Sequence, residues 1–359
     1  MNIHKKDIII IGCGCIGLSA GVILLKTGDY NVKIWAKDLP PNTTSNKAAA
    51  LWYPFLSEPL DKVGRWSQET MDYFKKEIIP LGVEKTGTLT KKVYELYRTP
   101  RAQLPEWSPF VPSFRRMKKE EMLDGYIDGF TVEDGFVMDT DQYMDWLVES
   151  FKALGGSIDQ REVVDIREPF IYADIVINCS GLGARELIGD RLVYPSRGQI
   201  IVVDNTRDIS LMDEEDEYQL GYVIPRVHNS VLGGTNQQHN YNLEPSKKDT
   251  EEILDRVAKI SPQFERKNLK ILGEKVGLRP SRYSIRLENE FMQDGRKLLV
   301  HNYGHGGSGF TVSWGCALDT LKLVRKGADK LKTSNKSDVP WYSLLNKRRS
   351  SSSCSFVND

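Results

Sequence analysis

The most specific spacing in the chain is a glycine-rich turn near its N-terminus, Gly12-Cys13-Gly14-Cys15-Ile16-Gly17. In such a turn the first glycine permits a tight bend, the second lets the backbone approach a pyrophosphate, and the third lets helix and strand pack closely. The pyrophosphate then lies at the N-terminus of the following helix. The turn therefore predicts a dinucleotide site at Gly12, Gly14, Ile16 and Gly17. The alternative is a glycine-rich turn that binds no ligand.

A second group of candidate cofactor residues follows the next predicted strand, which ends Ala36-Lys37-Asp38. In the usual pattern an acidic residue at this strand end binds the ribose hydroxyls. Asp38 is the candidate, although it comes one residue late. Lys37 would lie near a phosphate or in solvent, and a basic residue at this place also fits NADP.

The segment 41–52 helps to distinguish the kinds of dinucleotide. It reads Pro-Asn-Thr-Thr-Ser-Asn-Lys-Ala-Ala-Ala-Leu-Trp, so hydroxyl groups and small side chains dominate it. Such a segment can wrap closely round a second, larger part of a cofactor. This favours a flavin over a nicotinamide.

The elements that must position these residues begin with a βαβ unit. An apolar run at 7–11 predicts a strand buried on both faces, residues 18–24 have helical density, and residues 31–36 predict the second strand. Further along we expect helices at 143–154, 250–260 and from near Ser313 to about Leu331, and strands at 157–164, 174–178 and 297–300. A second glycine-rich turn, at 304–309, follows the last of these strands.

Composition excludes several other classes of protein. The 359 residues carry 49 Lys plus Arg against 49 Asp plus Glu, so no excess of positive charge is available for nucleic-acid phosphates. Five cysteines without regular spacing indicate reduced thiols rather than a disulfide framework. The longest apolar run near the N-terminus, residues 8–11, is far short of a membrane span or a signal peptide. We expect no nucleic-acid partner and no membrane insertion.

Six pieces of the chain, in this order, resemble the D-amino-acid oxidase family, flavoproteins that share a fold with D-aspartate oxidase. The resemblance runs from Asp7 to about Val324. The pieces are Trp-Ala-Lys-Asp-Leu-Pro (35–40), Ala-Ala-Ala-Leu-Trp-Tyr-Pro-Phe (48–55), Asn-Cys-Ser-Gly-Leu-Gly (178–183), Ser-Arg-Gly-Gln-Ile (196–200), Gly-Leu-Arg-Pro-Ser-Arg (277–282) and His-Asn-Tyr-Gly-His-Gly-Gly-Ser-Gly (301–309).

The resemblance implies an α/β fold in which a Rossmann-type FAD-binding domain is interleaved with a substrate domain built on a mixed β-sheet. We expect residues 1–52, 141–195 and 287–335 to form the FAD-binding domain, and residues 53–140 and 196–286 the substrate domain. The segment 336–359 is rich in serine, and we expect a disordered tail there.

The resemblance also implies noncovalent FAD, with the pyrophosphate at the first turn and the isoalloxazine between the domains. Carried over residue by residue, the cofactor contacts fall in three groups. They are Thr43, Thr44, Ala48, Ala49 and Leu51 along the cofactor, Val163 or Val164 and Ser180 by its adenosine half, and Gly306, Gly309, Phe310 and Thr311 by the flavin ring.

On the substrate side, Arg279 matches the family's arginine for the α-carboxylate, and a guanidinium suits a carboxylate because it can bind it bidentately. Tyr222 matches a tyrosine that makes a further carboxylate contact, and Tyr218 a tyrosine on a mobile lid. The Gly307 carbonyl would accept a hydrogen bond from the substrate amine. The acidic segment 213–217 before Tyr218 departs from the family.

The implied reaction is hydride transfer from the α-carbon of a D-amino acid, with neutral amine, to flavin N5. The imino acid then hydrolyses to a 2-oxo acid and ammonia, and O₂ reoxidises the flavin to give hydrogen peroxide. Catalysis of this kind depends mainly on positioning, and no metal site is expected.

Substrate range follows from three positions at which D-aspartate oxidases carry basic residues for a second carboxylate. Here they are Phe55, Glu215 and Asn236. This favours neutral D-amino acids, and the acidic segment leaves room for basic ones. Arg226 and Arg282 lie close in sequence to predicted site residues and have no role in the pattern above. Either could bind a second carboxylate, so an oxidase of acidic D-amino acids is the alternative.

Two rival functions stay open at this point: an NAD(P)-dependent dehydrogenase, and a flavin-binding relative that has lost turnover. Family members in eukaryotes are usually peroxisomal, which suits a producer of hydrogen peroxide. The chain ends Phe-Val-Asn-Asp rather than in a Ser-Lys-Leu type signal. The location is therefore expected from the resemblance alone, with the cytoplasm as the alternative, and a homodimer is left open.

Overall fold

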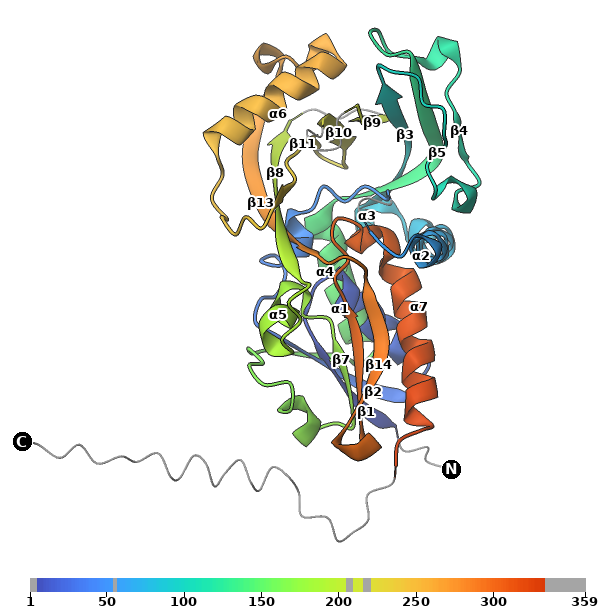
Figure 1. Cartoon of the computed structure of the whole chain (residues 1–359), viewed down its shortest axis with the longest axis vertical. Coiled ribbons are helices and arrows are strands. Elements are labelled where there is room, and N and C mark those ends of the chain that lie inside the picture. Colours follow the sequence, from blue (N-terminus) through green and yellow to red (C-terminus); the bar gives the residue numbers. More distant parts are fainter. Residues whose placement is uncertain (1–4, 54–56, 205–208, 216–220, 333–359) are drawn as a thin grey trace, which may run out of the picture.

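The computed structural model describes residues 5–53, 57–204, 209–215 and 221–332. Two β-sheets and the helices around them form an elongated molecule (Figure 1). The six-stranded sheet has the order β14 (Arg286–Met292), β15 (Lys297–Tyr303), β7 (Ile175–Asn178), β1 (Lys6–Ile11), β2 (Tyr30–Ala36) and β6 (Ser157–Gln160). All its pairs are parallel except β14 with β15. It is a Rossmann-type sheet with an antiparallel edge strand.

The nine-stranded sheet is mixed. Its order is β12 (Gln237–Gln238), β8 (Tyr194–Val203), β11 (Ser230–Gly233), β10 (Gly221–Pro225), β9 (Ile209–Asp213), β3 (Thr88–Tyr97), β5 (Asp128–Met138) and β4 (Phe114–Arg116), with β13 (Ile271–Ser281) paired to β8. The β3–β9 pair is parallel, whereas the other pairs are antiparallel. These two sheets confirm the predicted α/β fold class.

Helices cover both sheets, and their bounds are α1 (Cys15–Lys26), α2 (Leu60–Tyr73), α3 (Val83–Thr86), α4 (Thr140–Ala153), α5 (Ala184–Leu187), α6 (Lys247–Ile260) and α7 (Gly309–Ala328). Helix α1 packs against α4 and α7, and α2 also packs against α7. Helix α6 packs on β8, β10 and β11, on the outer side of the mixed sheet (Figure 1). Within the described ranges, no helix combines the length and the apolar character that crossing a bilayer requires.

The β1–α1 unit forms the centre of the Rossmann-type half because its residues are apolar on every side. Residues 8–11 are four buried isoleucines between the neighbouring strands β2 and β7. Ten of the twelve residues of α1 are buried. A Cβ on Gly17 would lie 2.1 Å from the Gly12 carbonyl oxygen, so only glycine lets the helix start this close to the turn.

Several predicted element boundaries differ from the observed ones. The strand expected at 157–164 ends at Gln160, because its partner β2 ends at Ala36 and offers no further backbone to pair with. The helix expected from Ser313 begins four residues earlier, at Gly309, and ends at Ala328 rather than Leu331. Helix α2 lies in the segment expected to belong to the substrate domain, and it packs against α7. The domain limits themselves stay a prediction.

Candidate active site

An elongated cavity of about 820 Å³ runs between the two sheets, from the β1–α1 turn to strands β10 and β13. This volume is in the upper part of the roughly 300–1,000 Å³ typical of small-molecule and cofactor sites. The cavity brings together most of the residues predicted from the sequence. They are Gly12, Gly14, Ile16, Lys37, Asp38, Thr43, Thr44, Ala48, Ala49, Leu51, Val163, Ser180, Tyr222, Arg279, Gly306, Gly307, Gly309 and Phe310.

Three predicted cofactor residues do not line the cavity. Gly17 lies behind the turn and serves the packing of α1 on β1. Val164 is 78% exposed, so of the two valines considered only Val163 lies at the site. Thr311 is buried, and its hydroxyl accepts from the Tyr53 backbone N–H at 3.1 Å and donates to the Tyr53 carbonyl at 2.9 Å. Thr311 therefore holds a lining residue rather than lining the site.

At the dinucleotide end, the backbone is shaped for close approach of a ligand. Gly12 has φ +111°, and a Cβ there would lie 2.3 Å from the Cys179 carbonyl oxygen. Gly14, the N-cap of α1, has no side chain to cap the helix, and the Cys15 N–H donates to Ser45 Oγ at 3.0 Å. A helix N-terminus that opens into a cavity fits a pyrophosphate.

Lys37 and Asp38 line the cavity at the end of β2. The Lys37 ammonium lies 2.9 Å from the Glu162 carboxylate, which also lines the cavity, although both side chains are largely exposed. Lys37 thus has a carboxylate partner at this end of the cavity. The acid at the end of this strand, Asp38, fits the ribose hydroxyls of a dinucleotide.

At the other end, Arg279 and Tyr222 approach the cavity from neighbouring parts of the mixed sheet. Arg279 Nη1 donates to the Thr235 carbonyl at 2.9 Å. Burial lowers the pKa of Arg279 and raises the pKa of Tyr222. In the described part of the chain no carboxylate forms an ion pair with Arg279, so its charge is directed at the cavity. An anion that entered there would restore the charge balance.

The two unassigned arginines have partners elsewhere. Arg226 is 3% exposed and donates to the carbonyls of Ala48 and Ala49 behind the cavity wall. Arg282 Nε lies 2.9 Å from Asp190 Oδ2, and its Nη1 donates to the Ser284 carbonyl at 2.8 Å. Neither lines the cavity. Their geometry is that of structural arginines.

The positions compared for a second carboxylate site are also engaged elsewhere. Glu215 accepts hydrogen bonds from the Arg98 and Thr99 backbone N–H groups, and Asn236 accepts one from the Ser196 hydroxyl. Phe55 and Tyr218 lie outside the described residues. Neither Glu215 nor Asn236 supplies the positive charge that a second substrate carboxylate would need.

Sequence reasoning missed several lining residues, among them Tyr53, Met212 and His305. Tyr53 was within a quoted motif, and alternation along the strand 209–213 could have pointed to Met212. Burial lowers the pKa of His305 to about 3, so its ring is neutral, and its Nε2 lies 3.1 Å from Asn302 Oδ1. Across the described ranges no three His, Cys, Asp or Glu side chains gather as a metal site would require.

Comparison with known proteins agrees with this geometry. The chain matches the family model "FAD dependent oxidoreductase" over residues 7–323. It is 64% identical to a D-amino-acid oxidase of Dictyostelium discoideum over 92% of this chain and 95% of that protein. It is 33% identical to a D-aspartate oxidase of Homo sapiens over 91% and 96% of the two chains.

The fold is similar to that of a solved glycine oxidase from Bacillus cereus, with TM-score 0.75, 20% sequence identity, and coverage of 93% of this chain and 100% of the other. At this identity the likeness concerns the fold. FAD, rather than NAD(P), is the cofactor of the matched family. The chain therefore belongs to the FAD-dependent oxidoreductases, in the family that contains the D-amino-acid oxidases.

Proposed function

We propose that this protein oxidises D-amino acids with neutral or basic side chains to 2-oxo acids, with release of ammonia and hydrogen peroxide. The observation that carries the proposal is the placement of charged groups near the substrate end of the cavity. Arg279 lines the cavity and supplies a cation for a carboxylate. The row of paired residues that starts at the lining residues Tyr222 and Met212 ends at a buried acid, Glu95, which does not itself line the cavity. The site thus favours one carboxylate and disfavours a second.

The residues of the cavity fit FAD. The turn at Gly12 and Gly14 and the start of α1 would hold the pyrophosphate, and Asp38 would bind the ribose hydroxyls. Residues 43–51 and 306–310 would lie along the rest of the cofactor. Bound FAD supplies the acceptor for the α-hydrogen and passes the electrons on to O₂.

This chain's own residues bind and orient the substrate. The Arg279 guanidinium would take the α-carboxylate through two charge-assisted hydrogen bonds, and the Tyr222 hydroxyl would donate a third. The Gly307 carbonyl oxygen would accept an N–H of the substrate amine. These contacts would fix the direction of the α-hydrogen, so the acceleration comes from orientation rather than from an acid or base in the chain.

The path for the substrate side chain follows one row across the mixed sheet. Tyr222 on β10 is paired with Met212 on β9, and Met212 is paired with Glu95 on β3. Residues paired in this way project from the same face of a sheet. With strands about 4.8 Å apart, Glu95 is about 10 Å from Tyr222 along the row. A long side chain that leaves the carboxylate anchor would cross Met212 toward Glu95.

Two buried acids lie at the end of this row. Glu95 is 4% exposed, and burial raises its pKa although hydrogen bonds from the Tyr97 and Tyr53 hydroxyls lower it. Burial and the nearby Glu95 raise the pKa of Glu214 to about 8, while Arg101 lowers it. Burial thus disfavours the ionised forms of both acids. A basic substrate side chain nearby would favour their ionised forms and gain an ion pair, whereas a second carboxylate would raise their pKa values further.

The alternative, specificity for acidic D-amino acids, requires a cation for the second carboxylate. Arg226 and Arg282 were the candidates, and both are engaged by carbonyls or by Asp190 away from the cavity. The chain retains Arg279, Tyr222 and Gly307, which argues against a relative without turnover. A peroxisomal location would suit a producer of hydrogen peroxide, and we propose it on that ground.

The test compares kcat/KM for D-alanine, D-arginine and D-aspartate, measured as hydrogen peroxide formation, in the parent and in Glu95→Gln. We expect D-alanine and D-arginine to be oxidised well and D-aspartate poorly. In Glu95→Gln the kcat/KM for D-arginine should fall several-fold relative to that for D-alanine. Glu133→Gln, a change on β5 at an acid paired with Lys92, is the matched control. A preference for D-aspartate in the parent would refute the proposed range.

A further inference from the structure

The guanidinium of Arg279 lies directly on the backbone of Gly198. A Cβ built on Gly198 would lie 2.5 Å from both Arg279 Nη1 and Nη2. On the same guanidinium, Nη1 donates to the Thr235 carbonyl at 2.9 Å. Gly198 therefore lets the guanidinium lie flat against the backbone, and the hydrogen bond to the Thr235 carbonyl fixes the orientation of the guanidinium.

The Tyr222 side chain likewise packs directly on glycine backbone. A Cβ on Gly233 or Gly234 would lie 2.3 Å or 2.6 Å from the Tyr222 hydroxyl oxygen. Tyr222 and Gly233 are paired across β10 and β11. The Tyr222 hydroxyl thus rests on the two residues that precede Thr235. The segment 233–235, which we call the anchor segment, contacts both groups proposed to bind the carboxylate.

Hydrogen bonds to β8 and α6 fix the anchor segment, among them a long one of 3.5 Å that the Thr235 hydroxyl donates to the Arg197 carbonyl. The Gln199 backbone N–H donates to the Thr235 hydroxyl at 2.9 Å, and Arg256 Nη2 donates to the Gly234 carbonyl at 2.9 Å. Thr235 is 6% exposed, so water does not replace the hydroxyl readily. The Thr235 hydroxyl is the side-chain acceptor that joins this segment to β8.

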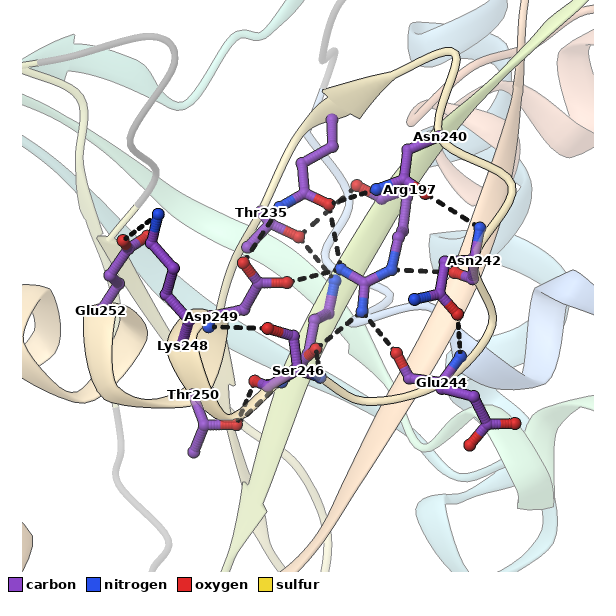
Figure 2. Close-up of polar contacts among 12 residues, drawn as sticks. Arg197, Thr235, Asn240, Asn242, Glu244, Ser246, Lys248, Asp249, Thr250 and Glu252 are labelled. Carbon is purple, nitrogen blue, oxygen red and sulfur yellow. Dashed lines mark hydrogen bonds and ion pairs between the residues drawn. The ribbon is translucent and has the colours of Figure 1, made fainter.

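Behind β8 lies a buried polar network (Figure 2). Arg197, 1% exposed, lies 2.6 Å from Asp249 and also donates to Gln199 Oε1 at 2.9 Å. Gln199 Nε2 donates to the Thr250 hydroxyl at 2.8 Å. The network holds the side chain of Gln199, whereas the backbone N–H of the same residue holds Thr235. β8 is thereby a firm support for the anchor segment.

We propose that Thr235 is a positioning residue for substrate binding, because its hydroxyl fixes the anchor segment and its carbonyl orients Arg279. This inference rests on the proposed function, in which Arg279 and Tyr222 bind the α-carboxylate. Thr235 does not line the cavity. Its effect falls on the affinity for the carboxylate rather than on the chemical step.

The variant Thr235→Val keeps the shape of the side chain but removes the acceptor for Gln199 N–H. Because a small misplacement of a binding group can cost up to about a hundredfold, we expect a rise in KM for D-alanine on the order of tenfold. The kcat value should change less than about twofold. The dissociation constant of D-lactate, a carboxylate without the amine, should rise as much as KM when followed by the visible spectrum of the holoenzyme.

Two further variants separate positioning from a structural role. Thr235→Ser retains the hydroxyl and should restore KM to near the parent value. Thr250→Val removes a hydroxyl from the network of Figure 2 without touching the anchor segment, so it should lower Tm while KM stays within about twofold. Flavin content, read from the visible spectrum, should stay at the parent value in all three.

The outcomes are distinct. An unchanged KM in Thr235→Val, or an equal rise in Thr250→Val, would overturn the positioning role while the parent still oxidised D-alanine. A parent that oxidises no D-amino acid would refute the proposed function instead. A rise in KM that Thr235→Ser fails to reverse would also contradict the inference, because it would show that the hydroxyl is not what matters.

Discussion

Replacing Arg279 with alanine removes the buried cation that lines the cavity beside Tyr222. In our account the guanidinium makes two charge-assisted hydrogen bonds to the α-carboxylate. Loss of one partner of such a buried pair costs about 3–5 kcal/mol, which corresponds to between about two and four powers of ten in binding. We therefore expect kcat/KM for D-alanine to fall by that factor, with most of the change in KM.

The stability of the variant should move the other way. Burial lowers the pKa of Arg279, so the folded chain holds this cation at a cost that no carboxylate in the described ranges offsets. Tm of Arg279→Ala should equal or exceed that of the parent. Arg282→Ala is the control, because it breaks the ion pair with Asp190: its Tm should fall while KM stays within about twofold.

The assay is oxygen consumption across a range of D-alanine concentrations, with flavin content measured on the same preparation. A KM within threefold of the parent value would remove Arg279 from the substrate site. A fall in Tm that parallels the loss of activity would indicate a structural arginine instead. Either result would refute the reasoning from the cavity.

Three further predictions follow from single groups. Gly12→Ala places a Cβ at φ +111° and 2.3 Å from the Cys179 carbonyl oxygen, so the protein should lose its yellow colour; full flavin content would contradict the assigned turn. Because burial raises the pKa of Glu214 to about 8, the folded protein favours its protonated form. The contribution of this group to stability is therefore fully present below about pH 4.5 and is lost as the pH rises to about 8. Glu214→Gln should therefore gain Tm over the parent at pH values above 8 but not below 4.5, and an equal difference at both would argue against burial of this acid. Arg226→Met leaves the Ala48 and Ala49 carbonyls without their donor, so Tm and flavin retention should fall, without any change in the ratio of D-aspartate to D-alanine activity; a changed ratio would make Arg226 a substrate residue.

Local sequence was enough to predict the dinucleotide end of the site. The turn at Gly12, Gly14 and Gly17 and the isoleucines of β1 act through neighbours in sequence, since backbone conformation and burial are set within the βαβ unit. The resemblance to a family added the substrate end. Arg279 and Tyr222 line the same cavity although 57 residues separate them.

Other features depend on long-range packing and were out of reach. Val164 and Thr311 were assigned to the cofactor, but the end of β2 and the backbone of Tyr53 decide where they lie. The roles of Arg226 and Arg282 follow from carbonyls and an acid far away in the chain. The row from Tyr222 to Glu95 requires the parallel β3–β9 register, which no local pattern reveals.

The most direct measurement is the visible spectrum of the holoenzyme under anaerobic conditions, before and after addition of D-alanine, D-arginine or D-aspartate, with the L-enantiomers as controls. The account predicts bleaching of the flavin by D-alanine and D-arginine, little by D-aspartate and none by the L-enantiomers. Bleaching by D-aspartate alone, or by none of the amino acids, would contradict it.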